Sequence, residues 1–240
     1  HHLDELTTLD ILDVNAGSHG YPFATNFNPE VNIREIKQDG KYWENGAWRT
    51  VGPFEMRWDY EFPEGLGKHP MYLKYHEELE TLTKHIPTLQ RARFWMGFSE
   101  QYIQHIRCFE NIGLTGIKPI MYEGRPIVPL QFLKALLPDP STLGARYTGK
   151  CCIGNLMTGK KDGKEKTVWI YNICDHQACY RETYSQGIAY TAGVPPALAA
   201  ILIARKQWVK PGVWNVEQLD PDPFMDLLNE RGLPWKVEVR

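Results

Sequence analysis

The chain has 240 residues, of which 42% are hydrophobic and 23% are charged, and its formal net charge at pH 7 is −2. This is the composition of an ordinary globular protein, with room for one large core or two smaller ones. It excludes the basic face that a nucleic-acid-binding protein needs, and no apolar run reaches the about 20 residues of a membrane-spanning helix. Five cysteines and no recognisable secretion signal lead us to expect reduced thiols in a cytoplasmic protein.

Hydrophobic periodicity and turn residues predict a mixture of strands and helices. Strands are expected at residues 8–14, 50–62, 91–98, 151–158, 166–174 and 236–239, and a short strand or turn is expected at residues 122–128. Helices are expected at residues 70–86, 99–113, 129–137, 178–191, 195–208 and 221–230. Asn45-Gly46 and the segment 159–163 predict hairpin turns. Because helices follow groups of strands without regular βαβ alternation, the pattern predicts an α+β layer with a mixed or antiparallel sheet.

An irregular polar stretch follows the first strand, from Asp13 to Arg34. It interleaves amides, a histidine and an arginine with aromatic residues, and its glycines and prolines permit tight backbone turns. Loops carry function more often than the elements they join, although the asparagines in this stretch could also simply cap turns. The stretch is therefore the first candidate site.

Three other motifs match known sites only in part. Gly65-Leu66-Gly67 lacks the third glycine of a dinucleotide loop, and Pro70 follows it. His76-Glu77-Glu78 lacks the second histidine of a zinc-protease helix, so we interpret it as a charged helix face. The run from Cys174 to Cys179 has zinc-ligand types without two well-spaced pairs, so no metal site is predicted. Its alternatives are a helix capped by Asp175 or a polar pocket edge that includes His176.

Four long runs, in the same order along the chain, resemble one enzyme family. They are NAGSHGYPFATNFNPEVNIREI, PIVPLQFLKALLPDPSTLG, IYNICDHQACYRETYSQGIAYTAGVP and PGVWNVEQLDPDPFMDLLNERGLPW. The sequence resembles the carboxynorspermidine synthases, also called carboxynorspermidine or carboxyspermidine dehydrogenases, within the saccharopine-dehydrogenase-like family. The resemblance extends over nearly the whole chain.

For the fold, the resemblance implies an α+β arrangement of the α/β family, a mixed β-sheet domain for substrate binding and dimerisation with helices on one face. It implies remnants of a Rossmann-type nucleotide domain at both ends of the chain. Residues 1–14 would end that nucleotide domain, residues 15–177 would form the substrate-binding and dimerisation domain, and residues 178–240 would be C-terminal helices that return toward the nucleotide domain. The GxGxxG loop of the family is missing from these 240 residues.

For the function, the resemblance implies an enzyme of polyamine biosynthesis that uses NADP(H). Such enzymes condense L-aspartate β-semialdehyde with a diamine, 1,3-diaminopropane or putrescine, and reduce the imine to carboxynorspermidine or carboxyspermidine. A homodimer is expected, without nucleic-acid or membrane partners. The alternatives are an enzyme like saccharopine reductase or homospermidine synthase, or a non-catalytic dimerisation module.

The chemistry of this reaction suggests which residues take part. A general acid/base with a pKa near neutrality is needed, and His19 is the first candidate. Asp175 and His176 form the second candidate pair. An arginine fork suits the substrate carboxylate, and an amide or carboxylate suits the amine. The substrate-binding candidates are Asn15, Asn26, Asn28, Glu30, Arg34 and Arg93, of which Arg93 could instead pair across strands.

Overall fold

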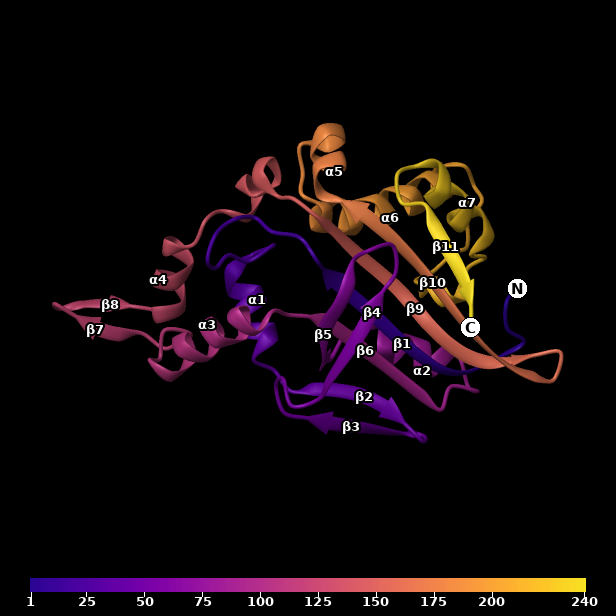
Figure 1. Cartoon of the computed structure of the whole chain (residues 1–240), viewed down its shortest axis with the longest axis horizontal. Coiled ribbons are helices and arrows are strands. Elements are labelled where there is room, and N and C mark those ends of the chain that lie inside the picture. The colour runs from indigo at the N-terminus through magenta and orange to yellow at the C-terminus, as the bar shows by residue number, and fades with distance from the viewer.

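The computed structural model describes residues 1–240, and a nine-stranded mixed sheet forms its centre (Figure 1). The strands are β1 (Glu5–Asn15), β2 (Gly40–Glu44), β3 (Ala47–Val51), β4 (Arg57–Phe62), β5 (Gly67–Lys74), β6 (Arg91–Gly97), β9 (Lys150–Lys161), β10 (Lys164–Asp175) and β11 (Trp235–Val239). The order is β11-β10-β9-β1-β6-β2-β3, with β5 joining β4 to β6. β1 and β6 run parallel, and the other neighbours are antiparallel. The mixed sheet predicted from the sequence is confirmed.

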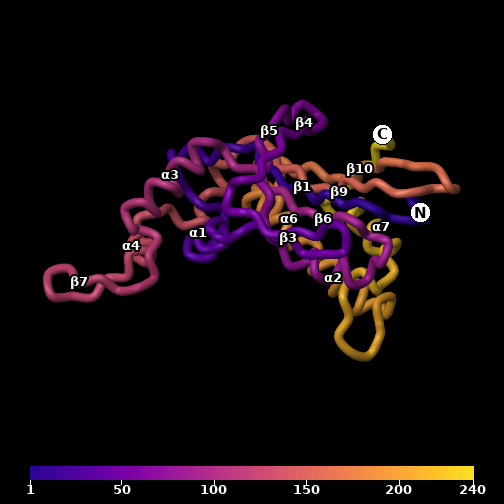
Figure 2. The backbone as a smooth tube through the Cα atoms, turned by 90° about the horizontal axis from the view of Figure 1, so that it is seen from below, coloured from indigo at the N-terminus to yellow at the C-terminus, as the bar shows by residue number.

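Seven helices and a separate hairpin complete the fold. The helices are α1 (Pro29–Ile36), α2 (Glu78–His85), α3 (Glu100–Asn111), α4 (Pro129–Leu136), α5 (His176–Thr183), α6 (Gly187–Ala204) and α7 (Asp222–Glu230). Three short 3₁₀ turns lie at Pro140–Thr142, Gly144–Arg146 and Val216–Gln218. The hairpin of β7 (Ile120–Tyr122) and β8 (Arg125–Ile127) projects beyond α4 at one end of the molecule, as Figures 1 and 2 both show.

Alternating side chains of β1 serve two cores on opposite faces of the sheet. Leu12 and Val14 pack toward the β4–β5 hairpin in a cluster with Met71, Trp95 and Trp169. Leu9 and Ile11 pack in a cluster with Leu79 of α2 on the other face. Because strand side chains alternate, Asp13 follows Leu9 and Ile11 on the helix-covered face. A carboxylate therefore stands at the end of an apolar stripe.

The helix predicted over residues 70–86 is wrong in its first half. Residues 67–74 are strand β5, and only Glu78–His85 is helical. Met71, Leu73 and Lys74 are all buried, because β5 lies between β4 and β6 and both of its faces are covered. A strand covered on both faces has an unbroken apolar run, which periodicity alone does not distinguish from a helix.

The strand predicted over residues 50–62 is also interrupted. Phe54 adopts a left-handed φ of +61°, and this turn separates β3 from β4.

The irregular stretch after β1 is shorter than expected, because Pro29 starts helix α1 with Asn28 as its N-cap. Proline at the first helical turn has no N–H to lose there.

The C-terminal helices break at a different point from the one predicted. The break lies at residues 184–186, where Tyr184 has a φ of +58°, and α6 continues through Pro195 and Pro196. α6 is long and apolar enough to cross a membrane by length and composition alone, a test that core helices also pass, and the sequence analysis did not anticipate it. Its buried residues Leu198 and Leu202 pack in a cluster with α7.

Residue 14, at which the sequence predicts a domain boundary, lies within β1. β1 pairs with β9 on one side and with β6 on the other, so it lies within the same sheet as the rest of the chain. At the other end, β11 pairs with β10 and α7 packs beside it (Figure 1).

Candidate functional site

The parallel strands β1 and β6 end at the same edge of the sheet, and two adjoining cavities of about 550 and 200 Å³ lie there. Crevices beyond the carboxyl ends of parallel strands are the usual ligand sites of such sheets. The two cavities share Asp13, Asn26, Phe27, Asn32, Met96 and Ile188. We call the larger one, with the carboxylates Asp13, Glu35, Asp39 and Glu77, the acidic lobe. We call the smaller one, with Asn15, Asn26, Asn32 and His19, the amide lobe.

Asp13 lies at the junction of the two lobes and is the residue that the sequence analysis missed. Its carboxylate makes no hydrogen bond or salt bridge within the chain, unlike Asp10 on the same strand, which pairs with Arg91 and Trp95. Burial raises the pKa of Asp13 to about 6, an effect that His76 partly offsets. A carboxyl group with this pKa can both donate and accept a proton near neutral pH.

His76 lies beside Asp13 in the acidic lobe. Its ring stacks on Phe94 with 4.3 Å between the centroids, and its Nδ1 bonds to Glu78. That hydrogen bond raises the pKa of His76. His76 and Glu77 precede α2 rather than forming its face, which corrects the interpretation of this motif from the sequence. The ligand atoms of His76, Glu77 and Glu78 lie within 4.8 Å of one another, but such a cluster alone does not identify a metal site.

Asn32 is a second residue that the sequence analysis did not single out. It is 6% exposed, it lines both lobes, and its Oδ1 accepts a 2.6 Å hydrogen bond from the Tyr102 hydroxyl. This bond orients the amide, so that its NH₂ group is left without a partner in the chain beside the cavity. Burial raises the pKa of Tyr102 far above its usual range, so the phenol stays neutral and donates. Asn32 is therefore a preoriented donor for a substrate oxygen.

His176 is fully buried and lines neither lobe. Its Nδ1 accepts from the Gly187 N–H at 3.0 Å, so Nε2 carries the proton and donates to Asn15 Oδ1 at 3.0 Å. Asn15 Nδ2 donates to the Tyr147 hydroxyl at 2.6 Å, and that hydroxyl donates to Asn26 Oδ1 at 2.8 Å. Burial lowers the pKa of His176 to about 4, which keeps the ring neutral. His176 thus positions the amides that line the amide lobe.

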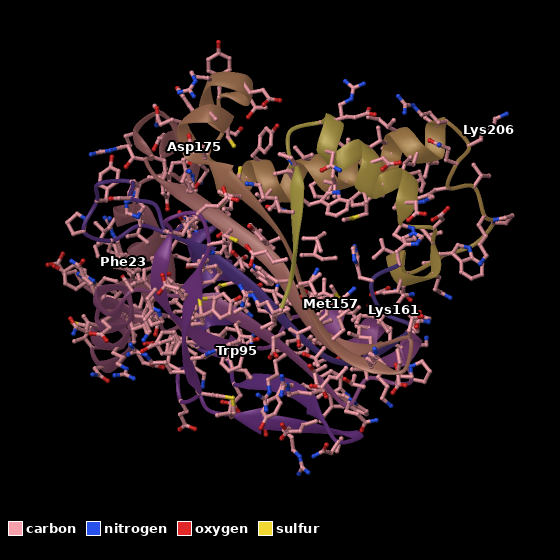
Figure 3. The ribbon with its side chains drawn as sticks, turned by 45° about the vertical axis from the view of Figure 1, so that its right-hand side comes forward. Phe23, Trp95, Met157, Lys161, Asp175 and Lys206 are labelled. Carbon is pink, nitrogen blue, oxygen red and sulfur yellow. The ribbon has the colours of Figure 1, made fainter.

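The other predicted acid/base candidates have different surroundings. Asp175 is the N-cap of α5, and its Oδ1 accepts from the Ala178 N–H at 2.8 Å, as one interpretation of the sequence expected. Figure 3 shows Asp175 at the end of the long β9–β10 hairpin. His19 lines the amide lobe, and its Nδ1 accepts from the Tyr21 N–H at 3.1 Å. Burial and the neighbouring Arg146 lower the pKa of His19.

Four of the predicted substrate-binding residues lie outside both lobes. Asn28 caps α1, where its Oδ1 accepts from the Glu30 N–H at 3.0 Å. Glu30 accepts from Gln131 at 2.6 Å and pairs loosely with Arg34 at 3.8 Å. Arg93 pairs with Glu44 across two strands, the alternative foreseen for it from the sequence. Asn15 and Asn26 do line the amide lobe.

Comparison with known proteins gives one family. A family model described as the saccharopine dehydrogenase C-terminal domain matches residues 3–233. Carboxyaminopropylagmatine dehydrogenase of Synechocystis sp. is 54% identical over 239 residues, which are 100% of this chain and 60% of that protein. Carboxynorspermidine synthase of Vibrio alginolyticus is 46% identical over 99% of this chain and 57% of its own length. The chain thus spans less than two thirds of these curated relatives.

A solved structure has the same fold. Apo histidine-tagged saccharopine dehydrogenase (L-Glu forming) from Saccharomyces cerevisiae aligns with a TM-score of 0.69 and 14% identity. The alignment covers 98% of this chain and 67% of that one. At this identity the likeness concerns the fold alone.

Proposed function

The chain belongs to the saccharopine dehydrogenase C-terminal domain family, and from this premise we propose that it forms the substrate site of an NADPH-dependent enzyme of polyamine biosynthesis. The proposed reaction condenses L-aspartate β-semialdehyde with a cationic amine and reduces the resulting imine. The observation that carries the proposal is Asp13, an unpaired carboxyl group between an acidic lobe and an amide lobe. Unpaired titratable groups with perturbed pKa values in a cavity are typical of catalytic sites.

Asp13 suits both proton transfers of the condensation. The amine must lose a proton before it attacks the aldehyde, and the carbinolamine must gain one before it loses water. A pKa of about 6 leaves mostly carboxylate and some carboxylic acid at neutral pH. A single group can therefore serve as base in the first step and as acid in the second.

The two lobes differ in the charge they accept. The amide lobe offers Asn32 as a donor and has no carboxylate other than Asp13, which suits the amino-acid half of the substrate. The acidic lobe has four carboxylates against Lys74 and His76, which suits the cationic amine. Lys74 does not neutralise a carboxylate directly, because its ammonium donates to the carbonyls of Ile36 and Gln38 at 2.9 Å.

Two kinds of amine fit this arrangement. The sequence analysis proposed 1,3-diaminopropane or putrescine, and the name carboxynorspermidine synthase supports a diamine. The name carboxyaminopropylagmatine dehydrogenase supports agmatine, whose far end is a guanidinium group. A reaction that joins two amino acids, as a saccharopine reductase does, would bring a second carboxylate toward the acidic lobe, which disfavours that alternative.

The hydride donor is assigned to NADPH on the sequence resemblance. The residues described here do not fit its phosphates, because Gly65-Leu66-Gly67 lies at the turn between β4 and β5, without a following helix. The relatives are longer than this chain, and we propose that their additional part holds the nucleotide. The residues of this chain would bind the two substrates, exclude water and move protons at Asp13.

The test uses the complete gene product that contains this chain. L-Aspartate β-semialdehyde and NADPH are supplied with agmatine, 1,3-diaminopropane or putrescine in turn, and NADPH oxidation and product mass are recorded. We expect turnover with at least one amine, and a product mass equal to the reduced adduct. NADPH oxidation with none of the amines would refute the proposal.

Tyr102→Phe is expected to raise the KM for the semialdehyde by about tenfold, with a smaller effect on the amine. The variant removes the hydroxyl that orients the Asn32 amide, so the preoriented donor is lost. Tyr122→Phe on the exposed β7 strand is the matched control. Equal KM changes for both substrates would indicate a general loosening of the site.

His19→Gln is expected to lower kcat/KM by only about threefold and to leave the shape of its pH profile unchanged. Its Nδ1 already accepts a backbone hydrogen bond, and glutamine can replace that acceptor. The measurement is kcat/KM between about pH 5 and 9, a range around the reference pKa of histidine. Loss of the acid limb in this variant would transfer the acid/base role from Asp13 to His19.

A further inference from the structure

Helix α6 contains two consecutive prolines in its interior, Pro195 and Pro196. Proline has no backbone N–H, so each one removes a helical hydrogen bond to the carbonyl four residues earlier. Pro195 leaves the carbonyl of Thr191 without its α-helical donor, and Pro196 does the same to Ala192. The Ala192 carbonyl cannot form a 3₁₀ bond either, because the residue three positions later is Pro195. The Ala192 carbonyl is therefore an acceptor that α6 itself does not satisfy.

Thr191 and Ala192 both line the acidic lobe, together with Ile188 and Ala189 from the preceding turn of α6. Backbone carbonyls without partners are costly when they are shielded from water, and they are satisfied by a donor when one is available. An ammonium or a guanidinium group is such a donor. Pro196 thus frees an acceptor on a residue that lines the cavity, whereas Pro223 lies in the first turn of α7, where no N–H is needed.

The same cavity is lined by two carboxylates of the α1 end, Glu35 and Asp39, that make no salt bridge in the chain. The one lysine that lines the cavity is Lys74. It is 6% exposed, and its ammonium already donates to two backbone carbonyls. Glu35 and Asp39 are exposed at the rim, where a cation could enter from solvent. The lobe therefore contains two kinds of cation acceptor: the carboxylates of Glu35 in α1 and of Asp39 just after it, and the Ala192 carbonyl of α6.

We propose that the acidic lobe is a subsite for the distal cationic group of the amine substrate, held by the carboxylates of Glu35 and Asp39 and by the proline-freed carbonyl of Ala192. The inference rests on the proposed function, because it assigns an end of the amine to this lobe. The reactive amine end would then lie at Asp13, at the junction with the amide lobe. The subsite would select amines that carry a second positive charge. A planar guanidinium group can donate to several of its acceptors at once.

Pro196→Ala tests the carbonyl half of the subsite in the complete gene product. The alanine N–H can bond to the Ala192 carbonyl, so that acceptor is no longer free. We expect the KM for agmatine and for putrescine to rise by about tenfold, with kcat changed little. The KM for n-pentylamine, which lacks the second charge, is expected to stay the same. Pro223→Ala in α7 is the control and should change neither amine. If the KM rises equally for amines with charged and neutral tails, or does not rise, the proposed role of the Ala192 carbonyl is overturned.

Glu35→Gln combined with Asp39→Asn tests the carboxylate half, and it also covers the case in which Pro196→Ala does not fold. We expect the KM for agmatine and for putrescine to rise by about tenfold or more, while the KM for n-pentylamine stays the same. Glu30→Gln on α1, which contacts Gln131 outside the cavity, is the matched control. An unchanged preference for the charged tail in the double variant overturns the subsite.

Titration calorimetry with the same amines separates this inference from the proposed function. Selective weakening of agmatine binding in the variants, in a protein that turns over none of the amines, would support the subsite and refute the reaction. Turnover of an amine without any preference for a charged tail would support the reaction and overturn the subsite.

Discussion

Asp13→Asn is expected to lower kcat/KM by a factor of about 10² to 10⁴, the usual contribution of general acid–base catalysis. Asparagine keeps the size of the side chain and removes its proton chemistry. The activity that remains should no longer show the acid limb of the kcat/KM profile, because the group with a pKa of about 6 that produces this limb is gone. Steady-state kinetics of the complete gene product across pH 5 to 9 measures both effects; the range brackets this pKa.

The same variant is expected to be more stable than the parent at pH 7. The pKa of Asp13 is about 6 in the folded state and about 3.9 in an unfolded chain, so between these values the folded state binds more protons. Ionisation therefore costs stability as the pH rises from about 4 to 6. Removing the charge should return about 2 kcal/mol at pH 7, or several degrees in Tm, after allowance for partial solvent exposure.

A gain in stability together with a loss of activity would identify Asp13 as a functional residue, since a structural carboxylate loses both. Asp226→Asn on the exposed side of α7 is the matched control and should change neither quantity. An Asp13→Asn variant that is less stable and fully active would contradict the assignment.

His176→Phe is expected to destabilise the fold at pH 7 by about 3 kcal/mol. Phenylalanine can keep the stacking on Tyr147, whose ring centroid lies 3.9 Å from that of His176. It cannot accept from the Gly187 N–H, which then has no partner, and it cannot donate to Asn15 Oδ1, which keeps only the Gly17 N–H. Urea unfolding of the 240-residue chain at pH 7 measures the difference.

The pH dependence separates this network role from simple packing. The pKa of His176 is about 4 in the folded state and about 6.5 in the unfolded state, so the unfolded state binds more protons between these values. Because of His176, the parent protein loses stability as the pH falls from about 6.5 to 4. The His176→Phe variant should not show this loss. His105→Phe on α3 serves as control, and an unchanged acid sensitivity in His176→Phe would contradict the buried neutral ring.

Predictions from the sequence are confirmed where the signal is local. The Asn45-Gly46 hairpin, the Asp175 cap and the β9–β10 hairpin each depend on residues a few positions apart, and the structure confirms them. The family was also correctly predicted, because long ordered runs carry that information directly. The extent of α6 was misjudged because Pro195 and Pro196 indicated a new helix start, while packing against α7 keeps one helix continuous through them.

The environment of each candidate side chain depends on the tertiary structure. Asp13 and Asp10 are carboxylates of the same strand, yet Arg91 and Trp95, more than 80 positions away, pair with one and leave the other free. His176 is a titratable type in a recognised motif, but a partner 161 positions away makes it a buried neutral link to Asn15. The sequence alone indicates the family, the local turns and caps, and the polar loop from Asp13 that borders the site. The fold decided which of its polar groups are paired, because burial and pairing depend on strands that meet only when the sheet has formed.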